Sequence, residues 1–172
     1  MPRRLHSIVL PAIAGALALA LGIGVAVWDR TAPDPSALLA LSLPDTQGTT
    51  QRLGQWRGKV LVVNFWATWC GPCREEMPEF VRAQRELGPQ GVQFVGIAVD
   101  QADKVARFAK ELDLNYPALV GGYDAMDVSK PLGNRLLALP FTVILGRDGQ
   151  IAHTQLGPLK PGQLRSILSN LI

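Results

Sequence analysis

Cys70 and Cys73 are the only cysteines among the 172 residues of the sequence, and two residues separate them. A thiolate can attack a disulfide, and a second thiol three residues away can then resolve the mixed disulfide that forms. This spacing therefore predicts thiol-disulfide exchange as the chemistry of the pair.

The residues on either side predict where the pair lies. Residues 59–65 form an apolar run rich in β-branched and aromatic side chains, which is typical of a buried strand. Residues 72–87 carry apolar side chains at helical spacing and end before a Gly-Pro stop. We expect Cys70 just before the first helical turn, where free N–H groups and the helix dipole favour a thiolate, and Cys73 on the same face.

Two other uses of the cysteines are less consistent with the sequence. A structural zinc site wants four ligands, and beyond the pair the chain offers only His6 and a lone His153, which we interpret as a surface residue. A purely structural disulfide would close so short a loop that it removes little chain entropy. Redox chemistry remains the favoured interpretation, and no metal site is predicted.

The sequence WCGPC at 69–73 resembles the active site of thioredoxins. The longer run NFWATWC at 64–70 is similar, more narrowly, to the membrane-anchored TlpA/ResA/CcmG group of thioredoxin-like proteins. The resemblance covers about residues 40–172. It implies an α/β thioredoxin-like fold, with a central mixed sheet flanked by helices, an N-terminal hairpin and a central insertion. It also implies a thiol-disulfide oxidoreductase with no cofactor beyond a redox-active Cys70–Cys73 disulfide.

The same resemblance assigns roles to residues around the pair. Cys70 would attack the substrate disulfide and Cys73 would resolve the mixed disulfide. Thioredoxin-like proteins have a cis-proline beside the pair, which implies that Pro140 holds the Leu139 backbone where an extended substrate strand can pair with it. The residues expected at the substrate are Trp69, Gly71, Pro72, Leu139 and Pro140.

Asn64 is where the sequence departs from thioredoxin itself, which has a buried aspartate at the matching place. Some members of the TlpA/ResA group instead have a glutamate three residues after the second cysteine, and Glu76 stands there. A carboxylate near the pair would raise the thiol pKa values and could pass protons during exchange. The alternative is an exposed helix glutamate like Glu75. Pro78 matches the proline that kinks the thioredoxin helix, and Trp66 is expected to pack in the core.

The remaining pattern predicts a strand-helix-strand order with a parallel crossover, and then an antiparallel hairpin. An Asp-Gly turn marks that hairpin. We expect strands at 39–43, 49–53, 91–100, 116–120, 139–145 and 150–155, and helices at 102–112 and 161–172.

The first part of the sequence predicts membrane attachment. Residues 8–28 carry no charge and are about twenty residues long, enough at roughly 1.5 Å per residue to cross a ~30 Å hydrocarbon core. Arg3 and Arg4 place residues 1–7 in the cytoplasm by the positive-inside rule. We expect 8–28 to be a transmembrane anchor or uncleaved signal, 29–37 a linker and 38–172 an exported thioredoxin-like domain. A cleaved signal is the alternative, with small-residue sites at 16–18 or 18–20.

Charge and cysteine content narrow the function further. Without Arg3 and Arg4, fifteen basic and fourteen acidic residues remain, so nothing indicates a nucleic-acid partner. Structural disulfides in exported domains usually come in several pairs, and a single pair is better suited to exchange.

The resemblance implies a single-pass protein of the inner (cytoplasmic) membrane, with its catalytic domain in the periplasm or otherwise outside the cytoplasm. Gly-Pro between the cysteines resembles reducing thioredoxins. A reductase outside the cytoplasm needs electrons from across the membrane, so the resemblance implies a DsbD- or CcdA-type membrane electron donor. The implied substrates are disulfides of exported proteins such as apocytochrome c. Two alternatives stay open: a broader periplasmic reductase that includes copper-centre cysteines, and a non-catalytic module that binds Cu(I) through the two thiolates.

Overall fold

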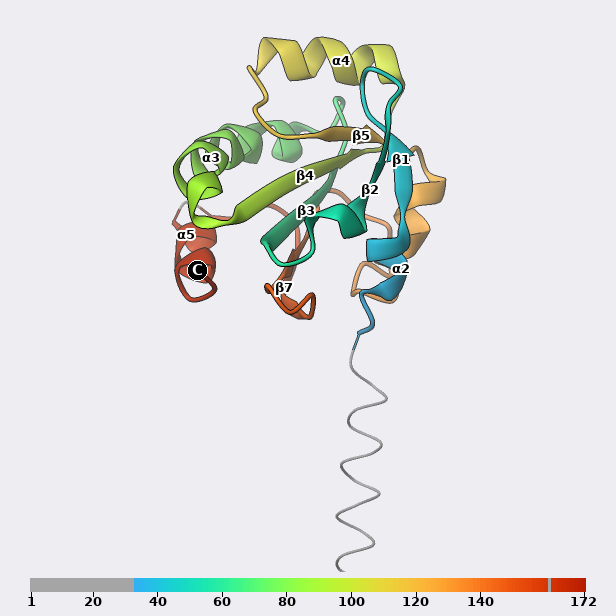
Figure 1. Cartoon of the computed structure of the whole chain (residues 1–172). Helices are drawn as coiled ribbons and strands as arrows, with labels where there is room; N and C mark the ends of the chain where they lie inside the picture. Colours follow the sequence, from blue (N-terminus) through green and yellow to red (C-terminus); the bar gives the residue numbers. More distant parts are fainter. Residues whose placement is uncertain (1–32, 161) are drawn as a thin grey trace, which may run out of the picture. The chain divides into compact units, whose positions relative to one another are not determined.

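The computed structural model describes residues 33–160 and 162–172 of the chain (Figure 1). In these two stretches, no helix is long and apolar enough to cross a membrane. The predicted anchor at 8–28 and residues 29–32 of the predicted linker lie outside the described residues.

A five-stranded mixed sheet forms the centre of the domain, in the order β5-β4-β3-β6-β7. β3 pairs in parallel with β4, β4 in parallel with β5, and β3 antiparallel with β6, which pairs antiparallel with β7. The mixed sheet predicted from the sequence is therefore present. The strands are β3 Val60–Trp66, β4 Val92–Ala98, β5 Ala118–Val120, β6 Phe141–Leu145 and β7 Ile151–Leu156.

Both faces of β3 are buried, because helices cover the sheet on each side. Alternate side chains of a strand point to opposite faces. Val60 and Val62 pack in one core cluster with Phe80, whereas Leu61 and Val63 belong to a second cluster on the other face. This explains why residues 59–65 are apolar throughout instead of alternating with polar residues.

Helices α3 Gly71–Leu87, α4 Ala102–Glu111 and α5 Gln163–Ser169 lie on one side of the sheet (Figure 1). Helix α2 Ser36–Ala40 and the 3₁₀ helix Asp124–Ser129 pack against the other face. This layering is the thioredoxin-like α/β arrangement.

A short hairpin precedes the core, with β1 Ser42–Pro44 paired antiparallel to β2 Thr50–Arg52. The prediction of a strand over 39–43 is wrong at its start, because residues 39 and 40 belong to α2. Leu38 and Leu39 are buried in the core from this helix. The central insertion is present as α4, β5 and the 3₁₀ helix, which all lie between β4 and β6.

Gly96 of β4 gives a test of how tightly the core packs beneath the cysteine pair. A Cβ added at Gly96 would lie 2.7 Å from Nε1 of Trp66, a fully buried side chain in the same cluster as Cys70 and Cys73. Alanine is otherwise preferred to glycine in a strand by roughly 0.5–1 kcal/mol, but such overpacking costs about 1–3 kcal/mol. We expect Gly96→Ala to lower the free energy of unfolding, measured in urea. The control is Gly71→Ala, where an added Cβ meets nothing within 4 Å; equal stability of the two variants would contradict the prediction.

Candidate active site

Cys70 and Cys73 form a disulfide at the turn from β3 into α3, with their Cα atoms 5.3 Å apart. Cys70 is the N-cap of α3, and its Sγ accepts a hydrogen bond from the backbone N–H of Cys73 at 3.3 Å. Cys70 is 6% exposed, whereas Cys73 is fully buried. Only the Cys70 sulfur is therefore open to an incoming substrate, and the helix start favours negative charge on it.

The turn that carries Cys70 is tied to the end of β4. The hydroxyl of Thr68 donates to the carboxylate of Asp100. Burial acts to raise the pKa of Asp100, but the Thr68 hydroxyl, the backbone N–H of Gln101 and nearby Lys104 lower it below its ordinary value. Asp100 is therefore ionised at neutral pH, and this charge strengthens the bond that holds the turn.

The two tryptophans near the pair differ in burial. Trp66 is fully buried, and its ring packs on Phe108 with centroids 5.4 Å apart. Trp69 is 60% exposed beside Cys70. The prediction that Trp66 packs in the core is confirmed, and Trp69 is placed to flank the reactive sulfur.

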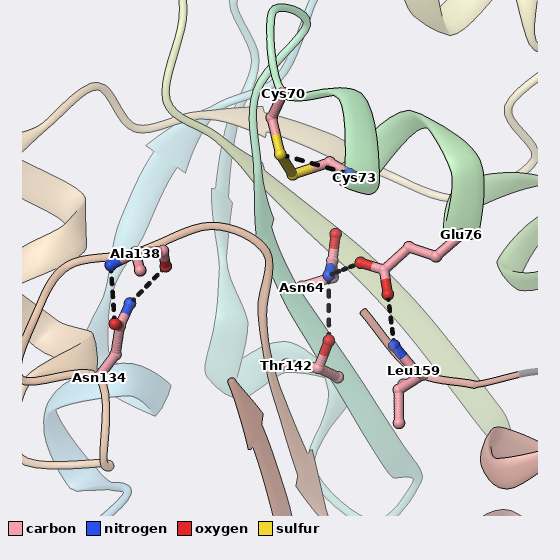
Figure 2. Close-up of a disulfide and its surroundings, with 8 residues drawn as sticks. All are labelled: Asn64, Cys70, Cys73, Glu76, Asn134, Ala138, Thr142 and Leu159. Atoms are coloured by element: carbon pink, nitrogen blue, oxygen red, sulfur yellow. Dashed lines mark hydrogen bonds between the residues drawn. A yellow bond between two sulfur atoms is a disulfide. The ribbon is translucent and has the colours of Figure 1, made fainter. Parts of the chain in front are cut away.

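The carboxyl group of Glu76 is buried one helical turn after Cys73, with 6% of the residue exposed. Asn64 Nδ2 donates to its Oε1 at 3.0 Å, and the backbone N–H of Leu159 donates to its Oε2 at 3.0 Å (Figure 2). The alternative interpretation of an exposed helix glutamate is therefore wrong. The buried face of α3 carries both Cys73 and this carboxyl group.

Burial raises the pKa of Glu76 from an ordinary value of 4.5 to about 7, although the hydrogen bonds from Leu159 and Asn64 act to lower it. Tyr116 is also buried, and burial and the nearby Glu76 raise the pKa of its phenol. The phenol stays neutral at physiological pH. Glu76 is thus a titratable group close to neutrality beside the cysteine pair.

Register explains the partner of Glu76 on β3. Asn64 lies directly opposite Thr142 of β6, so the two side chains share a face, and Asn64 Nδ2 donates to Oγ1 of Thr142 at 3.0 Å. This is the face that α3 covers. The polar residue that interrupts the apolar run thus fixes the Glu76 carboxyl group against the sheet.

A groove beside Cys70 is lined almost wholly by apolar side chains. Of the predicted substrate contacts, Trp69, Pro72 and Leu139 line it with Cys70, whereas Gly71 and Pro140 are not among the lining residues. No aspartate, glutamate, lysine, arginine or histidine is among the lining residues. The other lining residues are Val99, Tyr123, Met126, Leu137 and Ala138.

Pro140 follows the groove at the start of β6, and the Leu139–Pro140 peptide bond is cis, as the resemblance implies. Pro140 is buried and Leu139 is half-buried. His153, interpreted from the sequence as a surface residue, is half-buried in β7. Its Nε2 is buried and has no hydrogen-bond partner among the described residues.

Sequence reasoning missed several members of the site. Leu159 contributes a backbone N–H, which has no signature in a sequence. Tyr123 and Leu137 come from the central insertion, where neither periodicity nor a motif singled them out. Thr142 could have been found, because pairing β3 with β6 places it opposite Asn64.

Comparison with known proteins gives consistent matches. The Redoxin family matches residues 29–172 of the chain. The thiol-disulfide oxidoreductase ResA of Bacillus subtilis (strain 168) is 30% identical over 135 residues, which cover 76% of this chain and 70% of ResA. ResA of Bacillus thuringiensis subsp. konkukian (strain 97-27) is 29% identical over 130 residues, covering 74% of this chain and 72% of that protein. The crystal structure of a thioredoxin-family thiol:disulfide interchange protein from Chlorobium tepidum TLS aligns with a TM-score of 0.70 at 26% identity, covering 76% of this chain and 92% of that one.

The buried Glu76 makes stability depend on pH. Between about pH 4.5 and 7 the folded protein holds the Glu76 proton and the unfolded chain does not. The protonated Glu76 therefore stabilises the folded protein fully below about pH 4.5, and this stabilisation is lost as the pH rises through about 7. The loss lowers the free energy of unfolding by roughly 3 kcal/mol. We expect Glu76→Gln to remove this fall in the oxidised protein, measured by urea unfolding across the range. Glu75→Gln, on the exposed face of the same helix, is the control, and parallel curves for wild type and Glu76→Gln would contradict the assignment.

Proposed function

Because this chain is a thioredoxin-like thiol-disulfide oxidoreductase of the Redoxin family, in its TlpA/ResA/CcmG group, we propose that it reduces disulfides of exported proteins by dithiol exchange. The observation that carries the proposal is the unequal burial of the pair. Cys70 reaches a groove at the start of a helix, and Cys73 lies fully buried behind it.

The reaction follows from this arrangement. The Cys70 thiolate attacks one sulfur of the substrate disulfide, and the other substrate sulfur leaves as a thiolate and takes up a proton. Cys73 then loses its proton and attacks the Cys70 sulfur. The substrate leaves as a dithiol with two electrons gained, and the Cys70–Cys73 disulfide carries the matching oxidation. No cofactor beyond this disulfide takes part.

Glu76 is proposed as the group that exchanges the Cys73 proton. It lies on the buried face of α3 with Cys73, and a pKa of about 7 lets it accept and return a proton near neutral pH. A charged Glu76 also disfavours a second negative charge nearby, so it raises the pKa values of both thiols.

The residues proposed to bind the substrate are those around the groove. Trp69 and Pro72 contribute apolar surface beside Cys70, and the Leu139 backbone next to Pro140 offers main-chain hydrogen bonds to an extended strand. Gly71 is proposed to leave room for the substrate, since an added Cβ there would meet nothing within 4 Å.

Membrane attachment and export belong to the proposal. The uncharged segment 8–28 behind Arg3 and Arg4 supports a single-pass anchor in the inner membrane with the domain outside the cytoplasm. A reductase there needs electrons from across the membrane, so a DsbD- or CcdA-type donor is the expected partner. The family resemblance supports apocytochrome c as the substrate, in cytochrome c maturation.

The proton role of Glu76 predicts a kinetic defect. We expect Glu76→Gln to slow reduction of insulin, with a renewable reductant, by at least about tenfold. The pH profile of Cys70 alkylation should shift to lower pH, since the neighbouring negative charge is lost. Glu75→Gln is again the control, and an unchanged alkylation profile in Glu76→Gln would contradict the proposed proton role of Glu76.

Trapping tests the function as a whole. In full-length protein with Cys73→Ser, mixed disulfides on Cys70 cannot resolve, so we expect partners to accumulate for identification by mass spectrometry. The double variant with Cys70→Ser as well is the matched control, because it retains the groove and cannot form the bond.

The class of trapped partner distinguishes the three candidate functions. Apocytochromes c together with a membrane thiol transporter would support cytochrome maturation. Copper-oxidase subunits or a wide range of exported proteins would favour the broader reductase. A carrier that binds Cu(I) through Cys70 and Cys73 would yield no partner, and it would show metal stoichiometry with negligible insulin reduction.

A further inference from the structure

Asn134 lies in the loop before Pro140 and is fully buried although it is polar. Its side chain makes two hydrogen bonds to one residue: Nδ2 donates to the Ala138 carbonyl at 3.0 Å, and Oδ1 accepts from the Ala138 N–H at 2.9 Å (Figure 2). A single side chain therefore satisfies both backbone groups of Ala138.

The backbone of Asn134 closes the same loop. Its N–H donates to the carbonyl of Ser129 at 3.1 Å, and its carbonyl accepts from the N–H of Leu137 at 3.1 Å. Leu137 has a φ of 51°, a left-handed conformation that non-glycine residues adopt only when the surroundings hold them there. We call residues 134–138 the Asn134 loop.

This loop ends directly at the groove. Leu137, Ala138 and Leu139 all line it with Cys70. Within the described part of the chain, no hydrogen bond occupies the backbone N–H or carbonyl of Leu139. Asn134 therefore holds the carbonyl of the Ala138–Leu139 peptide unit, and the free N–H of that unit and the free Leu139 carbonyl lie beside the reactive sulfur.

We propose that Asn134 is a positioning residue of the exchange site, which holds the Leu139 backbone in place so that an extended segment of a protein substrate can pair with it next to Cys70. This inference rests on the proposed function, because it needs a protein disulfide as substrate. Pre-organised backbone groups spare the substrate the entropic cost of ordering the loop.

The proposal separates two kinds of disulfide. A small disulfide needs only the Cys70 sulfur and makes no main-chain pairing with Leu139. A protein substrate needs both the Cys70 sulfur and main-chain pairing with Leu139. Loss of the two bonds from Asn134 should therefore weaken binding of a protein substrate and leave the sulfur chemistry unchanged.

The test compares Asn134→Ala with wild type in the full-length, reduced protein, using insulin and 2-hydroxyethyl disulfide. We expect KM for insulin to rise about tenfold, the effect of losing the main-chain hydrogen bonds that the substrate makes with the Leu139 N–H and carbonyl. The value of kcat should stay within about twofold. The rate with 2-hydroxyethyl disulfide should also stay within about twofold. Asn134→Ser keeps a polar group without placing a charge at this buried position, but it is too short to satisfy both backbone groups of Ala138, so its KM for insulin should also rise.

Asn115→Ala is the matched control. It also removes an asparagine side-chain bond to the backbone, from Nδ2 to the Val81 carbonyl at 3.0 Å, but Asn115 does not line the groove. We expect its KM for insulin to equal that of wild type.

An unchanged KM in Asn134→Ala, or equal losses on both disulfides, would overturn the inference while wild-type insulin reduction still upheld the proposed function. Wild-type protein that reacts with 2-hydroxyethyl disulfide and fails on insulin would overturn both. If the alanine variant does not fold, the same comparison with Asn134→Ser decides.

Discussion

A carboxyl group held out of water beside a disulfide is the constraint around which this domain is arranged. Burying such a group is costly unless its oxygens are hydrogen-bonded. Helix α3 provides Glu76, β3 provides the Asn64 amide, and the segment before α5 provides the Leu159 N–H. These contacts join the reactive helix, the central strand and the C-terminal part of the chain at one point, and they fix the face of α3 that also carries Cys73.

Much of the fold could be predicted because its signals are local. The apolar run of β3, the helical spacing after Cys73 and the Asp-Gly turn each depend on neighbouring residues. The strand predicted over 39–43 was wrong at its start, because so short an apolar run fits a helix as well as a strand. In the structure Leu39 is buried as part of helix α2. The partners of Glu76 and Asn134 could not be predicted, because three of their hydrogen bonds use the backbone of Leu159 or Ala138, and any residue type can provide those groups.

Two asparagines hold different parts of the site. Asn64 binds the carboxyl group on the core side, and Asn134 holds the backbone that leads into the groove. The Asn134 amide both donates and accepts, whereas Asn64 donates twice from Nδ2 and its Oδ1 has no partner among the described residues. Neither side chain carries a charge, so each can be buried at lower cost than an ionised group. Because the groove lining contains no aspartate, glutamate, lysine, arginine or histidine, a substrate there is oriented by apolar contact and main-chain hydrogen bonds instead of by ion pairs.

Proton transfer and substrate binding use different parts of the site. In the proposed reaction Cys73 must lose a proton before it can attack, yet it is fully buried and water cannot reach it freely. A carboxyl group with a pKa of about 7 on the same helix face can take that proton at neutral pH and return it when the disulfide is reduced again. An aspartate or glutamate in water would be ionised throughout the neutral range and would rarely hold the proton. Burial of Glu76 is therefore what makes it useful, and the hydrogen bonds from Asn64 and Leu159 keep its pKa near neutrality instead of far above it.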